Sequence, residues 1–261
     1  MKLSVVIIAK NEESMIGKAL ESAGWADELV VVDSRSIDRT AQIARKFGAK
    51  VYQYSGEGSF DDWREYGAKK ARGEWIFYLD ADERISDGLR EDIKELVYGK
   101  QTTDYSGYDM PRQNVLLGHP MKHGGWWPDK VLRLIKKDKL KGYEGQLHEQ
   151  PKIDGRVGSL EGHLVHITHR SLSEMIEKTN KWSEIEAKLM FDAGHPPMNT
   201  ARFLSAMFRE FWYRAVVKLG FLDGVVGVIE IVYQVFSRFV SYAKLWEMQD
   251  KSQTSKVKSQ N

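Results

Sequence analysis

The sequence predicts an α/β fold, with a mainly parallel sheet flanked by helices and a helical extension at the C-terminus. Three observations carry this prediction. Short apolar, β-branched runs alternate with helical patterns through residues 1–100, and parallel neighbouring strands need such crossover connections. The runs are continuously apolar, which is typical of a sheet covered on both faces. From Ser171 onward the pattern is helical, with breaks at 194–197 and at Gly220.

Four strands and three helices are expected in the first 100 residues. The strands are the apolar runs Leu3–Ile8, Leu29–Asp33, Val51–Tyr54 and Trp75–Leu79. The helices are the amphipathic segments between them, at about 13–23, 38–47 and 61–72. Asp38 would begin the second of these helices, and capping is a sufficient explanation for it.

Between residues 105 and 168 the pattern changes to short strands separated by loops rich in Gly, Pro, His and Trp. Loops of this kind tend to carry binding residues. The expected strands are Tyr108–Arg112, Val131–Ile135 and Gly162–Ile167. We therefore expect one domain over 1–168 with halves 1–100 and 101–168, a helical extension over 169–250, and a polar, disordered tail over 251–261.

Composition excludes several classes of protein. The 261 residues include no cysteine and carry a net charge of +2. A disulfide framework, a thiolate zinc site and a cysteine nucleophile are therefore excluded, and nothing global favours nucleic acid as a partner. The apolar run at the N-terminus is too short for the core of a signal peptide, which predicts a cytoplasmic protein.

The strongest local motif is Leu79–Glu83, directly after the strand Trp75–Leu79. Ligands of parallel α/β sheets lie beyond the carboxyl ends of the strands. Asp80 and Asp82 would offer two carboxylates there to a divalent cation, Mg²⁺ or Mn²⁺, which also shares oxygens with phosphates. A turn at the strand end is the alternative interpretation, because Asp is common in turns.

Polar residues also follow two other strands. Ala9, Asn11 and Glu12 lie at the end of the first strand, and Asp33 ends the second. In a parallel sheet these ends meet at one edge, so the residues would form a single site together with Asp80. A carboxylate at position 33 is suited to accept the imide N–H of uracil.

Arg64 lies on the helix that precedes the aspartate motif. A guanidinium there would reach a diphosphate, and a solvated surface arginine is the alternative.

Three segments in this order, Ser4–Glu13, Val31–Thr40 and Ala71–Arg84, resemble the inverting glycosyltransferases of the GT-A fold, the large family that includes cellulose, chitin and lipopolysaccharide-type transferases. The resemblance covers residues 3–85 and implies a Rossmann-like, mixed sheet. It implies nucleotide contacts after the first two strands and a metal-binding aspartate pair after the fourth. Many members carry Arg-Asn where this chain has Arg64-Glu65, so the role of the arginine transfers less directly.

A second set of motifs is similar to the lipopolysaccharide inner-core β-glycosyltransferases that act on heptose-containing acceptors: Gly125–Leu134, His148-Glu149, His163–His166, Lys218–Gly224 and Tyr242–Glu247. This resemblance implies transfer of a hexose from a UDP-sugar, with UDP-glucose as first candidate, to a lipopolysaccharide-core or other cell-envelope glycolipid. It makes 1–100 the nucleotide-binding half and 101–168 the acceptor half of a catalytic domain.

An inverting transfer needs a base to take the proton of the acceptor hydroxyl. Glu149 is the first candidate, because many members of the family carry an acidic pair there, and Asp129 is the second. A turn after Pro128 or an ion pair with a core arginine would explain these acids structurally. His148 is the candidate third metal ligand. His163 and His166 are further candidates for binding the metal or the diphosphate. A structural role is the alternative interpretation for each histidine.

Trp126 and Trp127 lie in a glycine-rich loop. Aromatic faces suit the C–H surfaces of sugars, so these residues are candidates for the acceptor wall, and a place in the core is the alternative.

The helical extension combines aromatic and basic residues. Segment 202–219 contains Arg202, Arg209, Arg214 and Lys218, and segment 222–247 has one narrow polar stripe on an otherwise apolar helix. The stripe interrupts the run that a spanning helix needs. We expect peripheral docking on the anionic inner face of the cytoplasmic membrane. Packing as a helical hairpin or a homodimer stays open as the alternative.

The sequence disfavours two alternative functions. A sugar nucleotidyltransferase is disfavoured, because no glycine-rich, Arg- or Lys-containing loop follows the first strand. An inactive nucleotide-sugar-binding scaffold on the membrane is disfavoured by the retained aspartates and base candidate. A donor-hydrolysis assay distinguishes an active enzyme from such a scaffold, since a pure binding module does not hydrolyse the donor.

Overall fold

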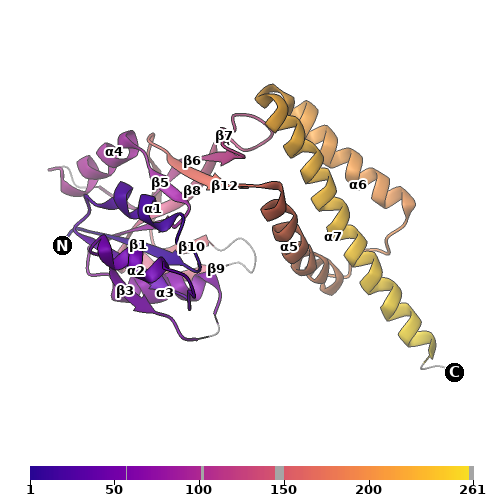
Figure 1. The fold of residues 1–261 in the computed structure, drawn as a ribbon, viewed down its shortest axis with the longest axis horizontal. Helices are drawn as coiled ribbons and strands as arrows, with labels where there is room; N and C mark the ends of the chain where they lie inside the picture. The colour runs from indigo at the N-terminus through magenta and orange to yellow at the C-terminus, as the bar shows by residue number, and fades with distance from the viewer. Residues whose placement is uncertain (57, 101–102, 145–149, 259–261) are drawn as a thin grey trace. The chain divides into compact units, whose positions relative to one another are not determined.

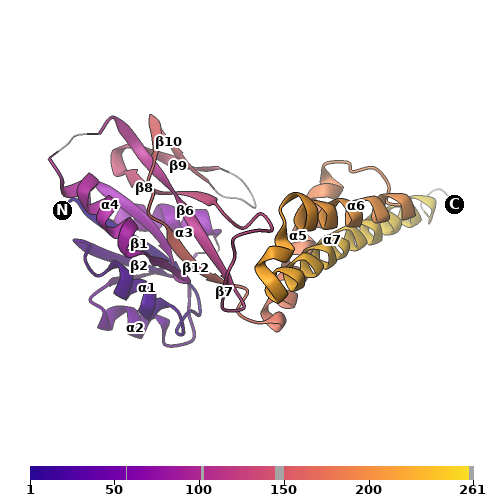
Figure 2. The same cartoon turned by 90° about the horizontal axis from the view of Figure 1, so that it is seen from above.

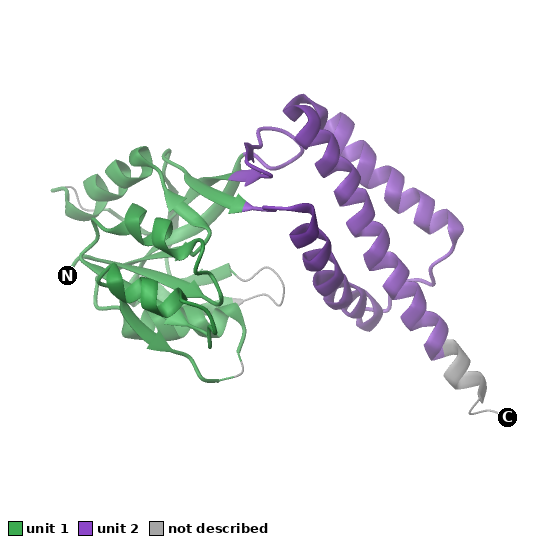
Figure 3. Cartoon of the chain, viewed as in Figure 1, with its two compact units in different colours: residues 1–113, 128–167 green, residues 114–127, 168–261 purple. Residues whose placement is uncertain are grey.

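The structure is a computed structural model that describes residues 1–258 except 57, 101–102 and 145–149. The chain divides into two compact units, drawn in green and purple in Figure 3. Unit 1 comprises residues 1–113 and 128–167, and unit 2 comprises residues 114–127 and 168–261. Unit 2 thus resumes at Thr168, and residues 114–127 group with the C-terminal helices and not with the strands of unit 1.

Unit 1 is built on a mixed sheet (Figure 1) whose main path runs β3-β2-β1-β4-β8-β6-β12-β5. The first four strands on this path are parallel, and β8 is antiparallel to both β4 and β6. Strands β11 and β7 add to β6, and β9 and β10 form a separate antiparallel pair. The bounds are β1 Leu3–Ala9, β2 Glu28–Asp33, β3 Lys50–Gln53, β4 Trp75–Asp80, β5 Glu83–Ile85, β6 Tyr105–Leu116, β7 His119–Pro120, β8 Asp129–Lys136, β9 Leu140–Glu144, β10 Gln150–Ile153, β11 Arg156–Ser159 and β12 Leu164–Thr168.

The register of the parallel strands aligns their carboxyl ends. Ala9 of β1 pairs with Asp33 of β2, and Ile8 of β1 pairs with Asp80 of β4. The two aspartates therefore flank the end of β1 at one edge of the sheet, as the sequence predicts.

Helices cover both faces of this sheet (Figure 2). Residues of α1 (Ile16–Ala23), α2 (Thr40–Lys46) and α4 (Asp87–Tyr98) share one core cluster with the apolar side chains of β1 that point to that face. Helix α3 (Phe60–Lys70) packs on the other face with β9 and β10. A Cβ at Gly67 would lie 2.4 Å from Cγ1 of Val6, so glycine permits the close approach of α3 to the sheet.

Several elements of unit 1 differ from the expectation. Helix α4 and strand β5, together with β9, β10 and β11, were not predicted. Helix α2 begins at Thr40 and not at Asp38. Asp38 instead accepts hydrogen bonds from the backbone N–H groups of Thr40 at 2.9 Å and Glu13 at 3.0 Å, so it ties the two loops that precede α1 and α2.

Unit 2 consists mainly of helices. They are α5 (Leu172–Asp192), α6 (Thr200–Trp212), a π-helical turn (Tyr213–Val217), a 3₁₀ turn (Gly220–Asp223) and α7 (Gly224–Lys258). Helix α7 packs along both α5 and α6. It continues to Lys258, beyond the position 251 where a disordered tail was expected. By length and composition, Gly220–Ser252 would suffice to cross a membrane.

Residues 114–127 interrupt unit 1 in the sequence and belong to unit 2; we call this segment the excursion. Asp223 accepts hydrogen bonds from the backbone N–H groups of Lys122 at 3.1 Å and His123 at 2.8 Å. The N–H of Gly124 donates to the carbonyl of Lys218 at 2.8 Å. These bonds join the excursion to the connection between α6 and α7.

Candidate active site

Asp80, the last residue of β4, lies between two arginines. Its Oδ1 accepts from Nη2 of Arg64 at 2.9 Å, and its Oδ2 accepts from Nη2 of Arg133 at 2.5 Å. Burial alone would raise the pKa of Asp80, but the charges of Arg133 and Arg64 outweigh it and hold the pKa well below its usual range. Both carboxylate oxygens are therefore already paired with cations.

Glu83 continues this pairing on the next strand. It begins β5, is fully buried, and its Oε1 accepts from Nη2 of Arg133 at 2.7 Å. Its Oε2 accepts from the backbone N–H of Asp80 at 3.0 Å, which closes the turn between β4 and β5. Burial opposes the charge on Arg133, yet Asp80 and Glu83 together raise its pKa above the usual value.

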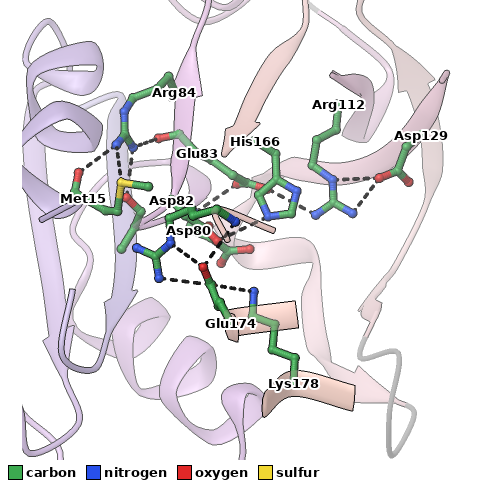
Figure 4. Close-up of polar contacts among 12 residues, drawn as sticks. Met15, Asp80, Asp82, Glu83, Arg84, Arg112, Asp129, His166, Glu174 and Lys178 are labelled. Carbon is green, nitrogen blue, oxygen red and sulfur yellow. Dashed lines mark hydrogen bonds and ion pairs between the residues drawn. The ribbon is translucent and has the colours of Figure 1, made fainter. Parts of the chain in front are cut away.

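Arg112 extends the row of charges across β6 and β8. Its Nη1 lies 3.3 Å from Oε1 of Glu83, and its Nε and Nη2 donate to Oδ2 of Asp129 at 2.9 and 2.7 Å. Figure 4 shows Arg112 between the two acids. Cations and anions thus alternate along six side chains, which we call the charge chain: Arg64, Asp80, Arg133, Glu83, Arg112 and Asp129.

Asp82 lies in the turn between β4 and β5, outside the charge chain. Its backbone carbonyl accepts from the N–H of Ile167 at 2.9 Å, and its Oδ2 lies 3.3 Å from Nε2 of His166 (Figure 4). The side chain of Asp82 is about a quarter exposed. Asp82 and His166 therefore present an oxygen and a nitrogen that suit a divalent cation.

Arg84 holds this turn against α1. It donates to the carbonyl oxygens of Ala81 at 2.9 Å, Glu83 at 2.6 Å and Met15 at 2.9 Å. Burial lowers the pKa of Arg84, and the neighbouring acids, Asp82 first among them, oppose that shift. The arginine fixes the backbone from which Asp82 projects.

The donor set fits a cation that is shared with a ligand. Within the described part of the chain, no group of three His, Asp or Glu side chains is arranged to hold a metal ion. Mg²⁺ and similar ions commonly take one or two protein carboxylates and complete their shell with substrate phosphates and water. The carboxylate of Asp82 matches that pattern, with His166 beside it, whereas Asp80 is paired with arginines.

Asp33 organises the loop after β2. Its side chain is almost fully buried, Oδ2 accepts from Nε2 of Gln53 at 2.6 Å, and Oδ1 accepts from the hydroxyl of Ser36. The Oγ of Ser36 in turn accepts from the backbone N–H of Asn11 at 2.9 Å. A nucleobase that binds at Asp33 would therefore share the carboxylate of Asp33 with Gln53 and Ser36.

The residues after β1 are held in the same loop cluster. Asn11 has a left-handed backbone with φ of 57°, and its Oδ1 accepts from the N–H of Ile37 at 2.9 Å. The N–H of Glu12 donates to Oγ1 of Thr40 at 2.8 Å, and the carbonyl of Ala9 accepts from Ser34 at 2.9 Å. The structure brings Ala9, Asn11, Glu12 and Asp33 together at the sheet edge where β4 ends.

Six other candidates are placed differently. Glu149 and His148 lie outside the described residues. Trp126 and Trp127 belong to unit 2, where the ring of Trp126 meets the ring of His169 edge-on at 5.7 Å between centroids. Asp129 lies in the charge chain and shares its Oδ2 with Arg112. The carbonyl of His163 accepts from the N–H of Ser86 at 3.3 Å.

Glu83, Arg112 and Arg133 belong to this site without having been candidates from the sequence pattern. One signal was available for Arg133, because it is the single charge inside the expected apolar strand Val131–Ile135. A charge buried in a strand requires an opposite partner.

Comparison with known proteins gives consistent matches. The family described as Glycosyl transferase family 2 matches residues 4–162. The lipopolysaccharide core biosynthesis glycosyltransferase LpsC of Rhizobium meliloti is 30% identical over 95% of this chain and 93% of that protein. An uncharacterized glycosyltransferase of Rickettsia typhi is 27% identical over 96% of this chain and 89% of its own.

Solved structures share the fold at low sequence identity. The mannosyltransferase PcManGT from Pyrobaculum calidifontis, in complex with GDP-Man and Mn²⁺, has a TM-score of 0.56 at 12% identity, covering 94% of this chain and 87% of that chain. S. aureus TarS 1–349, in complex with UDP-GlcNAc, has a TM-score of 0.50 at 16% identity, covering 98% and 92%.

Proposed function

Because the chain belongs to glycosyl transferase family 2 and is a glycosyltransferase of the GT-A fold, we propose that it transfers a hexose from a UDP-sugar to a glycolipid of the cell envelope. UDP-glucose is the first candidate donor, and the lipopolysaccharide core is the first candidate acceptor. The transfer inverts the anomeric centre and depends on a divalent cation. The donor comes from the cytosol, so the enzyme works on the cytoplasmic side.

The observation that carries this proposal is the alignment of Asp33 and Asp80 on either side of the end of β1. This register offers a nucleotide two strand ends on either side of β1, with the buried carboxylate of Asp33 at one and the Asp82 turn at the other. The similarity to LpsC over most of both chains supports the acceptor class. The PcManGT and TarS complexes, each with a nucleotide sugar and one of them with Mn²⁺, support the donor class and the cation.

Each residue has a defined task in this proposal. Asp33 accepts from the uracil ring, and the loop of Asn11 and Glu12 lies against the nucleoside. Asp82 and His166 would hold Mg²⁺ or Mn²⁺. Such a cation, when bound, supplies charge stabilisation for the departing diphosphate. Asp80 acts indirectly in this scheme, because its pairs with Arg64 and Arg133 fix the backbone next to Asp82.

A base must remove the proton from the acceptor hydroxyl while its oxygen attacks the anomeric carbon. We assign this task to Glu149. Asp129 is the weaker candidate, since two nitrogens of Arg112 already donate to its Oδ2. A carboxylate held in that way is suited to support the strand pair β6–β8.

A donor screen tests the proposal. The protein is incubated with UDP-, GDP- and ADP-sugars and a lipopolysaccharide-core acceptor, with Mn²⁺ or with a chelator, and nucleotide release is measured. We expect release from a UDP-hexose that requires both cation and acceptor, and loss of that release in Asp82→Ala. Equal release with the chelator, or release from GDP-sugars alone, would contradict the cation or the nucleotide assignment.

A further inference from the structure

The polar stripe of α7 faces the interior of unit 2. Glu230 is almost fully buried, and its Oε2 lies 3.6 Å from Nδ1 of His169. The hydroxyl of Ser241, also buried, donates to Oε2 of Glu186 on α5 at 2.6 Å. Lys244 donates to the carbonyl of Asn180 on α5 at 2.6 Å. Ser241 and Lys244 are thus hydrogen-bonded to α5, and Oε1 of Glu230 accepts from Gln234 on α7 itself.

The opposite side of α7 is apolar and open. Val225 and Val232 are 76% and 63% exposed, and the exposed row repeats at helical spacing. Helix α6 carries a second row, in which the rings of Phe208 and Trp212 stack with 5.9 Å between centroids. Phe203 of α6 meets Phe239 of α7 at 5.8 Å. We call the two rows the apolar face: Leu204, Phe208, Phe211, Trp212, Val225, Val228, Val232, Phe236 and Phe239.

A basic pocket lies at the start of α6, the helix that carries the second row. Its volume is about 440 Å³, and Arg202, Ser205, Arg209, Asn199, His195 and Tyr242 line it. Among the described residues, those that line it include no acid. Both arginines are exposed, and within the described residues neither forms an ion pair with a carboxylate. Arg202 donates from Nε to the carbonyl of Pro197 at 3.0 Å, which holds its guanidinium at the pocket.

We infer that unit 2 docks on a bilayer of anionic phospholipids, with the apolar face in the headgroup and acyl boundary and a lipid phosphate in the pocket of Arg202 and Arg209. Exposed apolar rows on two adjacent helices are typical of an interaction surface. Guanidinium groups match phosphate oxygens in charge and geometry. This inference goes beyond the proposed transfer and does not depend on the donor or the acceptor.

Docking in the plane fits the contacts better than crossing does. If Gly220–Ser252 crossed the membrane, Glu230 and Lys244 would lie in the hydrocarbon. Helix α5 is bonded to both Ser241 and Lys244, so its charged side chains would enter the hydrocarbon as well. Charged side chains at the centre of a bilayer are costly. A second copy is disfavoured as the occupant, because a two-fold interface repeats one patch on both sides and would bring the pocket arginines toward each other.

Vesicle flotation of the full chain tests the inference. Vesicles of phosphatidylcholine are compared with vesicles that also contain phosphatidylglycerol. We expect flotation with the anionic vesicles that weakens as salt is added. The double variant R202A/R209A should bind them about 30-fold more weakly, on the order of fivefold for each arginine. R45A/K46A, which removes two exposed basic residues from α2, is the matched control and should bind like the wild type.

The apolar face needs its own variants. L204S/F208S should lower binding to the anionic vesicles by at least tenfold, whereas I37S, at a 93% exposed position in unit 1, should leave it unchanged. Inorganic phosphate at matched ionic strength should displace little of the protein from vesicles, because it offers no apolar surface.

Four outcomes would overturn the inference. The first two are a wild type that fails to float with anionic vesicles at low salt, and an R45A/K46A variant that loses as much vesicle binding as R202A/R209A. The other two are a protein that binds inorganic phosphate through Arg202 and Arg209 without floating with vesicles, and a protein that forms a stable dimer on light scattering and does not bind vesicles. The last would assign the apolar face to a second copy of the chain.

Discussion

Nη2 of Arg133 lies 2.5 Å from Oδ2 of Asp80, and the same nitrogen lies 2.7 Å from Oε1 of Glu83. One guanidinium nitrogen therefore neutralises two carboxylates that come from consecutive strands. The side chain of Arg133 is 8% exposed and that of Glu83 is fully buried. Glu83 is out of reach of water and depends on its protein partners, and its Oε2 also accepts from the backbone N–H of Asp80 in the turn that carries Asp82.

The substitution Arg133→Met should therefore be strongly destabilising. It leaves the fully buried carboxylate of Glu83 and the partly buried carboxylate of Asp80 without their shared cation, and breaking a buried pair costs roughly 3–5 kcal/mol in the free energy of unfolding. Urea titration measures this loss. Arg39→Met is the control, because the pair of Arg39 with Glu13 lies at the surface and should contribute less than about 1 kcal/mol. Equal losses in the two variants would show that the charge chain carries no special share of stability.

Asp82→Ala should abolish metal-dependent donor binding and leave the fold intact. Asp82 projects from the turn with its side chain partly exposed, and Arg84 holds the backbone of that turn independently of it. Calorimetry with UDP-sugar and Mn²⁺ measures the effect. Unchanged affinity in the presence of Mn²⁺ would remove Asp82 from the metal site. His166→Ala should weaken Mn²⁺-dependent binding in the same direction.

Asp33→Ala should weaken UDP binding by about 1.5–3 kcal/mol, the value of a hydrogen bond to a charged group. The wild type should prefer UDP to CDP, since cytosine lacks the imide N–H, and the variant should lose that preference. Gln53→Ala separates base recognition from loop support, because it removes a partner of Asp33 but keeps the carboxylate. Loss of the preference in Gln53→Ala as well would make Asp33 a structural residue of the loop.

Glu149→Gln should retain donor binding and lose transfer, because an amide cannot take the proton of the acceptor hydroxyl at neutral pH. Asp129→Asn should retain much of the activity and lose stability, since it weakens the bond to Arg112. Rates of transfer and melting temperatures of both variants measure this. Normal transfer in Glu149→Gln, with loss in Asp129→Asn, would move the base to Asp129.

The stability of unit 1 should depend on pH through Glu28. Burial would raise the pKa of this acid, but hydrogen bonds from Ser4, Arg72 and Lys50 lower it from 4.5 to about 2. The folded state therefore binds this proton less readily than the unfolded chain. Glu28 contributes on the order of 3 kcal/mol above pH 4.5, and the contribution disappears as the pH falls toward 2.

Denaturant titrations of the wild type and Glu28→Gln between pH 2 and 7 measure this contribution. The two free energies of unfolding should differ most at pH 7 and converge at the acid end. A difference that stays constant with pH would show that the carboxylate charge of Glu28 is not what stabilises the fold.

The first half of the fold was predictable because its signal is local. The four strands around β1 are continuous apolar runs, and their boundaries differ from the expectation by one residue. Strand β5 has three residues and contains Glu83 and Arg84. This segment is a strand because it pairs with β12, which lies far along the chain. The local sequence pattern does not indicate a partner that distant.

The candidate site was predictable in position and less so in its contacts. Parallel topology is enough to bring Asp33 and Asp80 to one edge. The pairing of Asp80 with Arg64 and Arg133 depends on side chains from α3 and β8, which approach through packing that sequence spacing does not encode. The same reason explains why Arg112 and Glu83 received no role.

The excursion has a consequence for synthesis of the chain on the ribosome. The amides of Lys122 and His123 emerge about 100 residues before Asp223, which accepts them. At a translation rate of about 5–20 residues per second, the wait is on the order of 5–20 s. During that time the first unit can complete its sheet around β1, while residues 114–127 have not yet met their partners. Cotranslational folding should therefore finish with unit 2, and a chain interrupted before Asp223 should be a substrate for proteolysis at the excursion.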